Sequence, residues 1–505
     1  MKFNFAASDG TTTTVDVLIA PLFQEDLSKP INPAVSALDR SLGGVLIETA
    51  TREGFQAKRE QVWSLHAPQK FRARRVMLVG LGPRSKFSPE VLRQALGNAA
   101  RAIARFRGES AAVDLRSDVF QPDSIRAATE GLTLGSYRYD RYRTTDDQKP
   151  PSKLRSVTLL NRGGREEKAA ALLGSQVAEA TNWVRDLVNE PAGTLTPKRL
   201  AQEAASAARE GGLSISIRGR REIQKLRMGL FLGVAQGSVQ EPQLIEIRYT
   251  PRRRSRVKQA PIALVGKAIT FDSGGLSLKT HEGMLGMKAD MAGAAAVLGA
   301  MRVIASLAPP FPVYGFLGAC ENMPSGTAYR PGDILVSRLG KTVEVTNTDA
   351  EGRLVLGDVL AFANEQKPEM IIDLATLTGA CMIALGNYIG GAFGANSEAV
   401  QSVIAASQRA GEEFWPMPVS DLQKDALHSD VADLKNAGER WGGAINAALF
   451  LKEFVGDTPW VHLDIAGPSM SPTERGYQPK GATGVGVRTL VEFIRERARA
   501  FNPRS

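Results

Sequence analysis

The chain has 505 residues, of which 43% are hydrophobic and 23% are charged, and this globular composition allows two domains with sizeable cores. Its formal net charge is +10. The sequence contains no long uninterrupted apolar window and no signal-peptide core, so we expect no membrane span and no secretion. The two cysteines, Cys320 and Cys381, lie in apolar runs, so we expect reduced core thiols in a cytoplasmic protein and exclude a thiolate zinc site.

Residues 1–165 are predicted to form a smaller α/β domain. The sequence RRVMLVGLG (74–82) is typical of a strand that runs into a glycine turn. Residues 88–106 then have the apolar period of an amphipathic helix, with Ser88 as its expected N-cap. A strand followed by a helix is the repeating unit of an α/β fold, and residues 157–162 predict a further strand.

A long helical pattern over 166–190, stopped by Pro191, predicts a helix that connects this domain to a larger one over 191–505. Near-continuous apolar strands alternate with helices in the larger domain, which indicates a mixed, largely parallel sheet buried on both faces and flanked by helices. The strands are expected at 261–268, 311–320, 342–347, 369–377 and 460–467, and the helices at 290–307, 352–366 and 489–501. The fold class is therefore α/β with two domains.

Acidic and basic residues follow several of these strands. In open α/β sheets, binding sites form beyond the carboxyl ends of the strands. Buried carboxylates need cations, and two divalent metals would balance four acids; carboxylate oxygens suit Mg²⁺, Mn²⁺ and Zn²⁺. The pattern therefore favours a dimetal or phosphate-binding site. Its candidate residues are Lys267, Asp272, Lys279, Asp290, Asp349, Glu351 and Arg353.

A purely structural interpretation is available for several of these residues taken singly. Asp349 and Glu351 could interact favourably with the positive end of the dipole of the helix that follows them, and Asp290 could be an N-cap. Capping does not explain Lys267 at the end of a strongly apolar strand, or Arg353 within the same turn as the acids. The combination therefore favours a site.

The four histidines do not form a zinc motif. His281 lies in a loop near the expected site and His462 lies within a strand, and neither belongs to an HExxH pattern, so we expect each to be satisfied or solvated. No GxSxG nucleophile, Cys–His pair or phosphate-binding GxxxxGK[ST] loop is found. Histidine-rich zinc, serine, cysteine and nucleotide hydrolases are therefore disfavoured.

Several stretches together resemble one family. NTDAEGRL (347–354) resembles the signature of the leucyl aminopeptidases, the cytosol aminopeptidase family. The resemblance covers about 187–470 and is weak over the first 165 residues, where it implies a variable, macro-like N-terminal domain. The other matching stretches, in the order of the family, are LVNEPAGTLTP (187–197), VGKAITFDSGG (265–275), MKADMAGAAAV (287–297), ENMPSGTAYRPGD (321–333), DLATLTGA (373–380), GNYIGGAFG (386–394) and HLDIAG (462–467).

The resemblance implies a dimetal centre with two divalent ions, Mn²⁺ or Zn²⁺, in each subunit. Lys267, Asp272, Asp290 and Glu351 would bind the tighter metal, and Asp272, Asp349 and Glu351 the more exchangeable one. A lysine ligand must be neutral, which an adjacent dication permits by lowering its pKa. The two metals would bridge and acidify the water that attacks the peptide bond.

The resemblance also implies catalytic and substrate-binding residues. Lys279 would stabilise the oxyanion, and the planar fork of Arg353 would hold a bicarbonate anion that acts as a base. Ala268 departs from the glycine usual in the family, and we expect its one extra methyl group to be tolerated. The implied substrate-binding residues are Met287, Asn347, Thr376, Leu377, Gly379, Ala466 and Met470.

The sequence thus predicts a dimetal aminopeptidase that removes an N-terminal residue, preferably Leu or another apolar residue, from peptides. The resemblance implies a cytoplasmic homohexamer built as a dimer of trimers. The alternative is a DNA-binding regulator, possible in addition to peptidase activity, because the net charge is +10 and residues 252–258 are strongly basic. No aromatic residues interleave with this basic run, so a solvated loop is its simpler interpretation.

Overall fold

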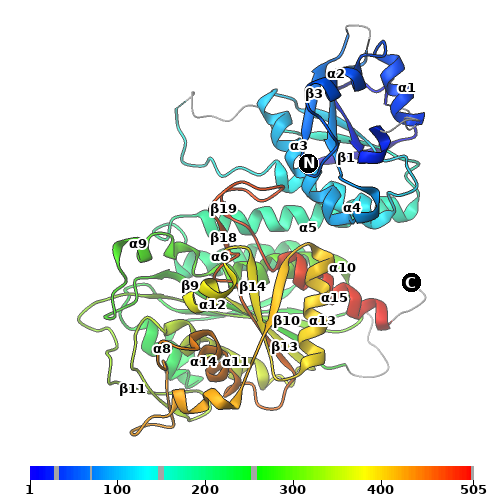
Figure 1. The fold of residues 1–505 in the computed structure, drawn as a ribbon. Helices are drawn as coiled ribbons and strands as arrows, with labels where there is room; N and C mark the ends of the chain where they lie inside the picture. The colour runs from blue at the N-terminus through cyan, green and yellow to red at the C-terminus, as the bar shows by residue number, and fades with distance from the viewer. Residues whose placement is uncertain (9, 28–32, 69–70, 146–152, 252–258, 502–505) are drawn as a thin grey trace. The chain divides into compact units, whose positions relative to one another are not determined.

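The computed structural model describes residues 1–501 except 9, 28–32, 69–70, 146–152 and 252–258 (Figure 1). Its contacts divide the chain into unit 1, Met1–Asn182 with Thr473–Lys480, and unit 2, Trp183–Pro472 with Gly481–Ser505. The boundary between them falls within helix α5 (Arg165–Asn189). Residues Thr473–Lys480 belong to unit 1 because of their tertiary contacts. The local sequence does not predict this assignment.

Unit 1 contains a six-stranded sheet with helices on both faces. The strand order is β1-β6-β5-β2-β4-β3, and all neighbours are parallel except β3, which is antiparallel to β4. Helices α3 (Pro89–Arg105) and α4 (Pro122–Gly135) pack on one face, and α1 (Pro33–Ser41) and α2 (Leu46–Arg52) on the other. The strands are β1 Lys2–Ala6, β2 Val15–Leu22, β3 Val62–His66, β4 Ala73–Gly80, β5 Ser110–Asp114 and β6 Ser156–Leu160.

Helix α3 is the helix predicted over 88–106. Ser88 occupies the N-cap position with an extended backbone, but its side chain makes no capping hydrogen bond. Pro89 at the first helical position supplies the start signal instead, because its fixed φ suits a helix and its missing N–H would have had no partner there.

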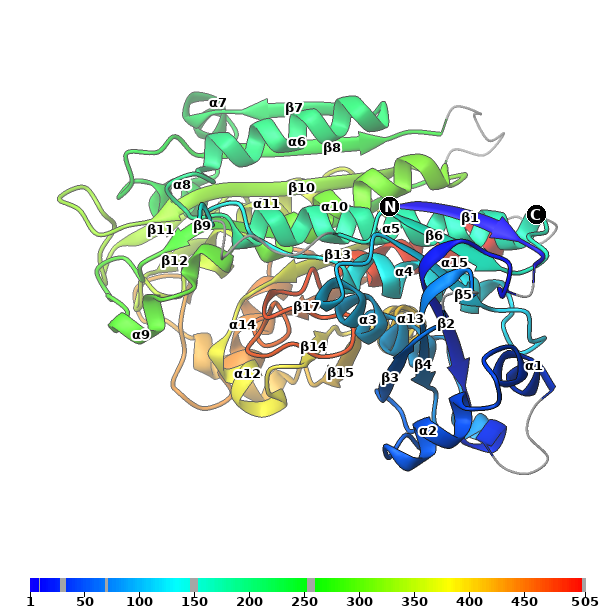
Figure 2. The same cartoon turned by 90° about the horizontal axis from the view of Figure 1, so that it is seen from above.

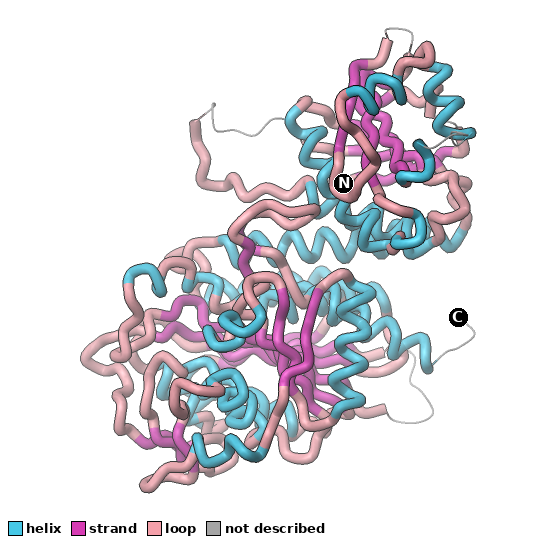
Figure 3. The backbone as a smooth tube through the Cα atoms, viewed as in Figure 1, coloured by secondary structure: helices cyan, strands magenta, loops and turns pink. Residues whose placement is uncertain are grey.

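Unit 2 is built on an eight-stranded mixed sheet in the order β15-β14-β17-β13-β9-β10-β8-β7 (Figures 2 and 3). Its four central strands are parallel, whereas β8 and β7 on one side and β14 on the other run antiparallel to their inner neighbours. The predicted mixed, largely parallel sheet is confirmed. The strands are β7 Ser214–Arg218, β8 Gln243–Tyr249, β9 Ile262–Asp272, β10 Val313–Asn322, β13 Met370–Ala375, β14 Ile389–Phe393, β15 Glu413–Met417 and β17 Trp460–Asp464.

Helices cover both faces of this sheet. On one face lie α6, α10, α13 and α15, and on the other α8, α11 and α14 (Figure 1). The strands between them are buried on both sides, which explains their continuous apolar sequences. The helices are α6 Pro197–Gly211, α7 Arg220–Lys225, α8 Gly229–Ala235, α9 His281–Met284, α10 Ala292–Leu307, α11 Glu351–Asn364, α12 Gly379–Leu385, α13 Ser397–Ala410, α14 Gly443–Lys452 and α15 Val487–Phe501.

Helix α10 is the core helix of unit 2. A Cβ at Gly293 would lie 2.0 Å from the Leu374 carbonyl oxygen of β13, so the small residues of this helix allow it to pack close against the sheet. The stretch His281–Leu307 is long and apolar enough to cross a membrane, but 78% of its 18-residue apolar window is buried inside the protein. Cys320 and Cys381 are also buried, and both are free thiols, as predicted.

The strand predicted at 342–347 is not part of the main sheet. Strand β12 (Thr342–Glu344) pairs with β11 (Ile334–Val336) and β16 (Leu434–Lys435) in a separate three-stranded sheet. The expectation that all the acids follow strands of one sheet is therefore wrong for Asp349 and Glu351. Alternating apolar residues identify a half-buried strand but not the sheet to which it belongs.

Candidate active site

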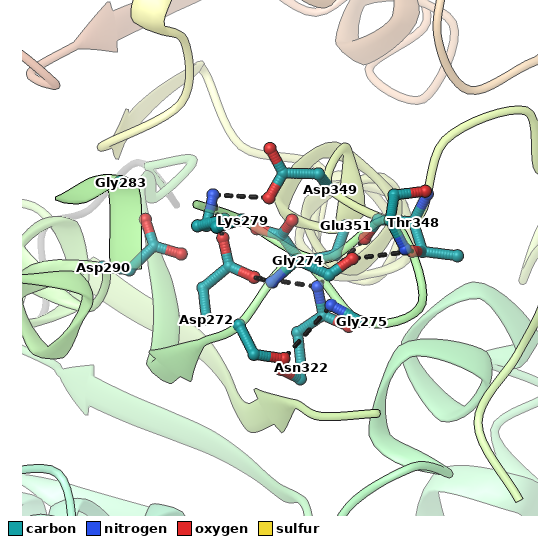
Figure 4. Close-up of polar contacts among 12 residues, drawn as sticks. Asp272, Gly274, Gly275, Lys279, Gly283, Asp290, Asn322, Thr348, Asp349 and Glu351 are labelled. Atoms are coloured by element: carbon teal, nitrogen blue, oxygen red, sulfur yellow. Dashed lines mark hydrogen bonds and ion pairs between the residues drawn. The ribbon is translucent and has the colours of Figure 1, made fainter. Parts of the chain in front are cut away.

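A cluster of charged side chains lies where β9 meets its neighbours. Strand β10 lies on one side of β9 and β13 on the other, so the carboxyl end of β9 is a topological switch point, where α/β sheets form their sites. Lys267 lies within β9, as predicted, and the strand continues beyond the predicted end at 268, so that Asp272 is its last residue. Both side chains are buried, and Asp272 faces the other acids of the cluster (Figure 4).

The remaining acids reach the cluster from the starts of two helices. Glu351 is the first residue of α11 and is buried, while Ala350 occupies the N-cap position without a side-chain hydrogen bond. Asp290 follows the short 3-10 helix Met287–Ala289 and precedes α10, whose N-cap is Met291. Asp290 is therefore not the N-cap of α10, whereas Glu351 lies in the first turn of α11, where an acid interacts favourably with the helix dipole. The dipole does not explain why these acids converge.

Three carboxylates converge closely enough to share a metal ion. Asp272, Asp290 and Glu351 each offer an oxygen, and these oxygens lie within 4.8 Å of one another. The Oε2 atom of Glu351 is buried without a hydrogen-bond partner among the described residues. An orphaned carboxylate oxygen surrounded by other acids is what a cation ligand requires, so these residues fit a divalent metal.

Two lysines supply the positive charge among these acids. The Nζ atom of Lys267 lies 2.8 Å from Asp290 Oδ2 and 2.9 Å from Glu351 Oε1. The Nζ atom of Lys279 lies 2.9 Å from Asp272 Oδ2 and 2.5 Å from Asp349 Oδ1. Each ammonium group thus bridges two carboxylates, so two positive charges face four negative ones.

The protonation equilibria reflect this excess of negative charge. Burial, followed by repulsion from Asp272, raises the pKa of Glu351 to about 8, and burial raises the pKa of Asp290 to about 6. Burial alone would lower the pKa of Lys267, but attraction to the carboxylates outweighs it and the pKa is raised. The cluster is therefore short of positive charge, which bound cations would supply.

Hydrogen bonds from neighbouring residues hold Asp272 in place. These residues were not identified from the sequence. Asn322, the last residue of β10, donates from Nδ2 to Asp272 Oδ1 at 2.8 Å and to the Thr348 carbonyl oxygen at 2.9 Å. The main-chain N–H of Gly274 donates to the same Asp272 oxygen at 2.8 Å (Figure 4). The Tyr329 hydroxyl also donates to the Thr348 carbonyl, at 2.7 Å. The signal was present in the 321–333 motif, which contains both Asn322 and Tyr329.

Thr376 contacts the other side of the cluster. Its carbonyl oxygen accepts a hydrogen bond from Lys267 Nζ at 3.1 Å, and its hydroxyl donates to Asp290 Oδ1 at 2.8 Å. Thr376 comes directly after β13, so the sheet register fixes both contacts. A residue predicted from the resemblance to bind substrate thus also holds two candidate metal ligands.

Arg353 is the third residue of α11 and is buried at 8% exposure. Its Nη1 donates to the Asn436 carbonyl oxygen at 2.9 Å, and the described residues form no ion pair with it. Asn436 donates from Nδ2 to the Asn347 carbonyl at 2.7 Å, which ties this support to the turn before α11. Burial lowers the pKa of Arg353 to about 10, so the guanidinium remains charged at neutral pH and can receive an anion.

The predicted site residues all line one cavity of about 750 Å³. The two histidines considered earlier do not line it: His281 is exposed, and His462 pairs with Asp373 at 2.6 Å. Lining residues that sequence reasoning missed include Leu285, Asn446 and the loop at 437–440. The predicted residues that line it are Lys267, Asp272, Lys279, Met287, Asp290, Asn347, Asp349, Glu351, Arg353, Thr376, Leu377, Gly379, Ala466 and Met470.

Comparison with known protein families identifies the family of the chain. The profile of the cytosol aminopeptidase family, catalytic domain, matches residues 182–491, and the profile of the N-terminal domain of the same family matches residues 19–146. The chain belongs to the cytosol aminopeptidase family. Membership makes it an aminopeptidase, a hydrolase of peptide bonds, and confirms the resemblance seen in the sequence motifs.

Relatives match along nearly the whole chain. A probable cytosol aminopeptidase of Gloeobacter violaceus is 41% identical over 490 residues, which cover 95% of this chain and 96% of the relative. One from Aquifex aeolicus is 45% identical and covers 83% of this chain and 84% of its own length. These alignments span both units, so the two-domain organisation is shared with the family.

Solved structures give the same result. A mutant of tomato leucine aminopeptidase is 36% identical, has a TM-score of 0.89, and covers 98% of this chain and 96% of its own. The bottromycin maturation enzyme BotP, in complex with Mn, is also 36% identical, with a TM-score of 0.84 and coverage of 96% and 100%. A manganese-bound relative agrees with the fit of the acidic cluster to a divalent metal.

Proposed function

We propose that the chain is a dimetal aminopeptidase that releases the N-terminal residue of peptides and prefers Leu or another apolar residue. One observation carries the proposal. Four carboxylates and two lysines, without a histidine, meet at the carboxyl end of β9 inside a cavity large enough for a peptide end. The manganese complex of BotP supports the choice of a divalent metal.

The residues divide into two ligand sets. Lys267, Asp272, Asp290 and Glu351 would hold one metal ion, and Asp272, Asp349 and Glu351 the other, with Mn²⁺ or Zn²⁺ as the candidates. When bound, such a pair polarises a carbonyl group and lowers the pKa of water to supply a nucleophile at neutral pH. Lys267 pairs with Asp290 and Glu351, and it must lose its proton to act as a ligand.

Lys279 and Asp290 would contact the substrate directly. Lys279 is paired with Asp272 and Asp349, and neutralisation of those acids by cations would release its ammonium group to donate to the oxygen of the scissile carbonyl. The buried carboxylate of Asp290 would accept a hydrogen bond from the free α-amine of the peptide. An amine requirement explains why such a site removes only the first residue.

Arg353 is the proposed anion site. Its buried guanidinium remains charged, and its planar fork matches a carbonate-type anion bidentately. An arginine cannot itself accept a proton from water, whereas a bicarbonate held by it would supply a base. The anchor of Arg353 on the Asn436 carbonyl fixes the direction of the fork.

The remaining cavity residues define the substrate pocket. Met287 and Met470 bring flexible apolar side chains, while Thr376, Gly379 and Ala466 are small. A pocket of this kind suits Leu or Met, and its discrimination should be modest because one methylene group is worth about 1–3 kcal/mol. Asn347 and Leu377 complete the proposed substrate contacts.

Gly352→Ala should weaken metal binding about 10–100-fold, the usual effect of disturbing a support of a metal ligand. The added Cβ would lie 2.4 Å from Lys267 Cε and 2.6 Å from its Nζ, so the lysine head must move. Gly326→Ala is the matched control, because a Cβ at Gly326 meets nothing within 4 Å. Titration of the metal-free variants with Mn²⁺ measures the effect; equal affinities in both variants would remove Lys267 from the ligand set.

The proposed reaction is tested by the need for a free α-amine. The protein should release leucine from Leu-Gly-Gly and should leave N-acetyl-Leu-Gly-Gly intact, because an acetylated amine cannot be held by Asp290 and the metal. Amino-acid analysis of the products measures this. Release of glycine from the carboxyl end, or cleavage of the acetylated peptide at a similar rate, would contradict aminopeptidase activity of the proposed kind.

Assembly and surroundings follow from the family resemblance. We propose a homohexamer in the cytoplasm that acts on peptides without a membrane partner. The basic run at 252–258, on which the DNA-binding alternative rested, lies outside the described residues. No observation among the described residues or the relatives favours DNA binding, so it is not carried forward as a second function.

A further inference from the structure

The C-terminal end of α5 contacts two separate segments that line the substrate pocket. Asn189 is the last residue of α5 and is 8% exposed. Its main-chain carbonyl oxygen accepts a hydrogen bond from Lys288 Nζ. Its side-chain Oδ1 accepts a hydrogen bond from the main-chain N–H of Ala482 at 3.2 Å. One residue therefore holds two segments that lie far apart in the sequence.

The first contact holds the turn that carries Met287. Lys288 is the next residue in the 3-10 helix Met287–Ala289, so fixing its ammonium group restrains the backbone from which the Met287 side chain enters the cavity. The last carbonyl groups of a helix carry the negative end of its dipole and favour a cation. The end of α5 is thus a suitable anchor for Lys288.

The second contact holds the strand pair that carries Met470. Strand β18 (Met470–Ser471) pairs with β19 (Gly481–Ala482), and Ala482 lies opposite Met470 (Figure 1). A pair of two-residue strands is unstable by itself. The segment that joins these strands, Thr473–Lys480, belongs to unit 1. Within unit 2 the pair therefore depends on contacts such as the one from Asn189.

A second residue of α5 strengthens the same anchor. Arg185, one turn before Asn189, is fully buried and donates from Nε to the Thr483 carbonyl oxygen at 2.9 Å. The Thr483 hydroxyl donates to the Pro468 carbonyl at 2.6 Å, and its N–H donates to the Ser469 carbonyl at 3.1 Å. These bonds hold the two residues that directly precede Met470, so α5 also restrains the segment that leads into β18.

We infer that Asn189 is a positioning residue that sets the width of the substrate side-chain pocket, because it ties the Met287 turn and the Met470 strand pair to one rigid helix end. The inference rests on the proposed function, which assigns these two methionines to the pocket. The methionine side chains are flexible, so the separation of their backbones decides how well a Leu or Met side chain is enclosed. The metal ligands Asp272 and Glu351 come from β9 and α11 and do not depend on this anchor. Asp290 follows the Met287 turn, but that turn is held by the main-chain carbonyl of Asn189, which a side-chain substitution at Asn189 leaves in place.

The inference predicts a change in selectivity rather than a general loss of rate. Asn189→Ala removes Oδ1 but keeps the main-chain carbonyl, so it loosens the Met470 wall. The kcat/KM for Leu-amide and Met-amide should fall about 10-fold, mainly through KM, while that for Ala-amide should change less than about 3-fold. Asn189→Asp keeps an acceptor oxygen and should restore the Leu/Ala ratio. Metal content by elemental analysis should equal that of the wild type.

Asn182→Ala is the matched control. Asn182 lies in the same helix and donates from Nδ2 to the Thr133 carbonyl oxygen at 3.1 Å, away from the pocket. It should lower the melting temperature without changing the Leu/Ala ratio. If Asn189→Ala does not fold, Lys288→Met, which keeps the apolar stem and removes the ammonium group, is scored by the same ratio.

Different results would overturn the positioning role of Asn189 and the proposed function. An unchanged Leu/Ala ratio in Asn189→Ala, or the same ratio change in Asn182→Ala, overturns the positioning role and leaves the proposed function standing. A wild-type protein that carries metal and hydrolyses none of the amides overturns the proposed function itself.

Discussion

Glu351→Gln is expected to lose both metal ions and more than about 100-fold of the activity, because removing a ligand shared by two cations should cost more than disturbing a residue that only supports a ligand. The carboxylate of Glu351 belongs to both proposed ligand sets, and its oxygen lies within 4.8 Å of those of Asp272 and Asp290. Glutamine has the same shape but no charge. Elemental analysis of the purified variant after gel filtration measures the stoichiometry directly.

Two companion variants make this result specific. Asp349→Asn should lose mainly the more exchangeable ion, because Asp349 belongs to one ligand set only. Asp358→Asn is the matched control: Asp358 is a buried acid in the same helix, but it accepts hydrogen bonds from the N–H groups of Phe231 and Arg338 at 3.0 and 2.7 Å and contacts none of the proposed ligands through them. It should keep both ions. Full occupancy in both Glu351→Gln and Asp349→Asn would refute the ligand assignment.

The metal-free Glu351→Gln protein should be at least as stable to heat as the metal-free wild type. Burial and repulsion from Asp272 raise the pKa of Glu351 to about 8, so its charged form is disfavoured in the folded protein. Glutamine resembles the protonated form and carries no such penalty. Loss of metal without loss of metal-free stability would therefore separate a ligand defect from a folding defect.

Arg353→Ala is expected to retain both metal ions and to lose about 10²–10⁴-fold in turnover, the usual contribution of a general base. The guanidinium of Arg353 touches the Asn436 carbonyl but no carboxylate among the described residues, so its removal leaves the metal ligands in place. Turnover of Leu-amide is measured in degassed buffer with increasing bicarbonate. The wild type should be stimulated, and Arg353→Ala should respond far less.

Lys279→Ala provides the comparison for Arg353. It should also lose rate, through the oxyanion, yet it should keep the stimulation by bicarbonate that Arg353→Ala lacks. Identical bicarbonate responses of the wild type and Arg353→Ala would mean that Arg353 does not hold the anion. One of the metal-binding carboxylates would then have to be reconsidered as the base.

The sequence predicted the cluster well where local pattern and topology coincide. The apolar strand that became β9 and the rule that sites follow strand ends led to Lys267, which lies within this central strand, and to Asp272, which lies at its carboxyl end. The motif resemblance brought in the pocket residues, such as Met470, which lies far from the acids in sequence and lines the same cavity. Spacing alone could not have connected Met470 to them.

The remainder required the folded chain. The sequence of the short strand β12 is typical of a strand of the main sheet. Its pairing with β11 and β16 depends on tertiary contacts, which the alternation of Val343 and Val345 does not predict. Likewise, the roles of Asn322 and Asn436 follow from hydrogen bonds to residues that are distant in the sequence. Asn322 donates to the Asp272 carboxylate, and the Asn436 carbonyl accepts from Arg353. Polar residues that position others have no periodicity of their own.

Removal and replacement of metal tests the central claim most directly. The purified protein is dialysed against a chelator until elemental analysis finds no divalent metal, and hydrolysis of Leu-amide is then measured before and after addition of Mn²⁺, Zn²⁺ or Mg²⁺. The dimetal account predicts that the metal-free protein is inactive and that Mn²⁺ or Zn²⁺ restores activity as two equivalents bind. Full activity in protein verified to contain no metal would contradict it.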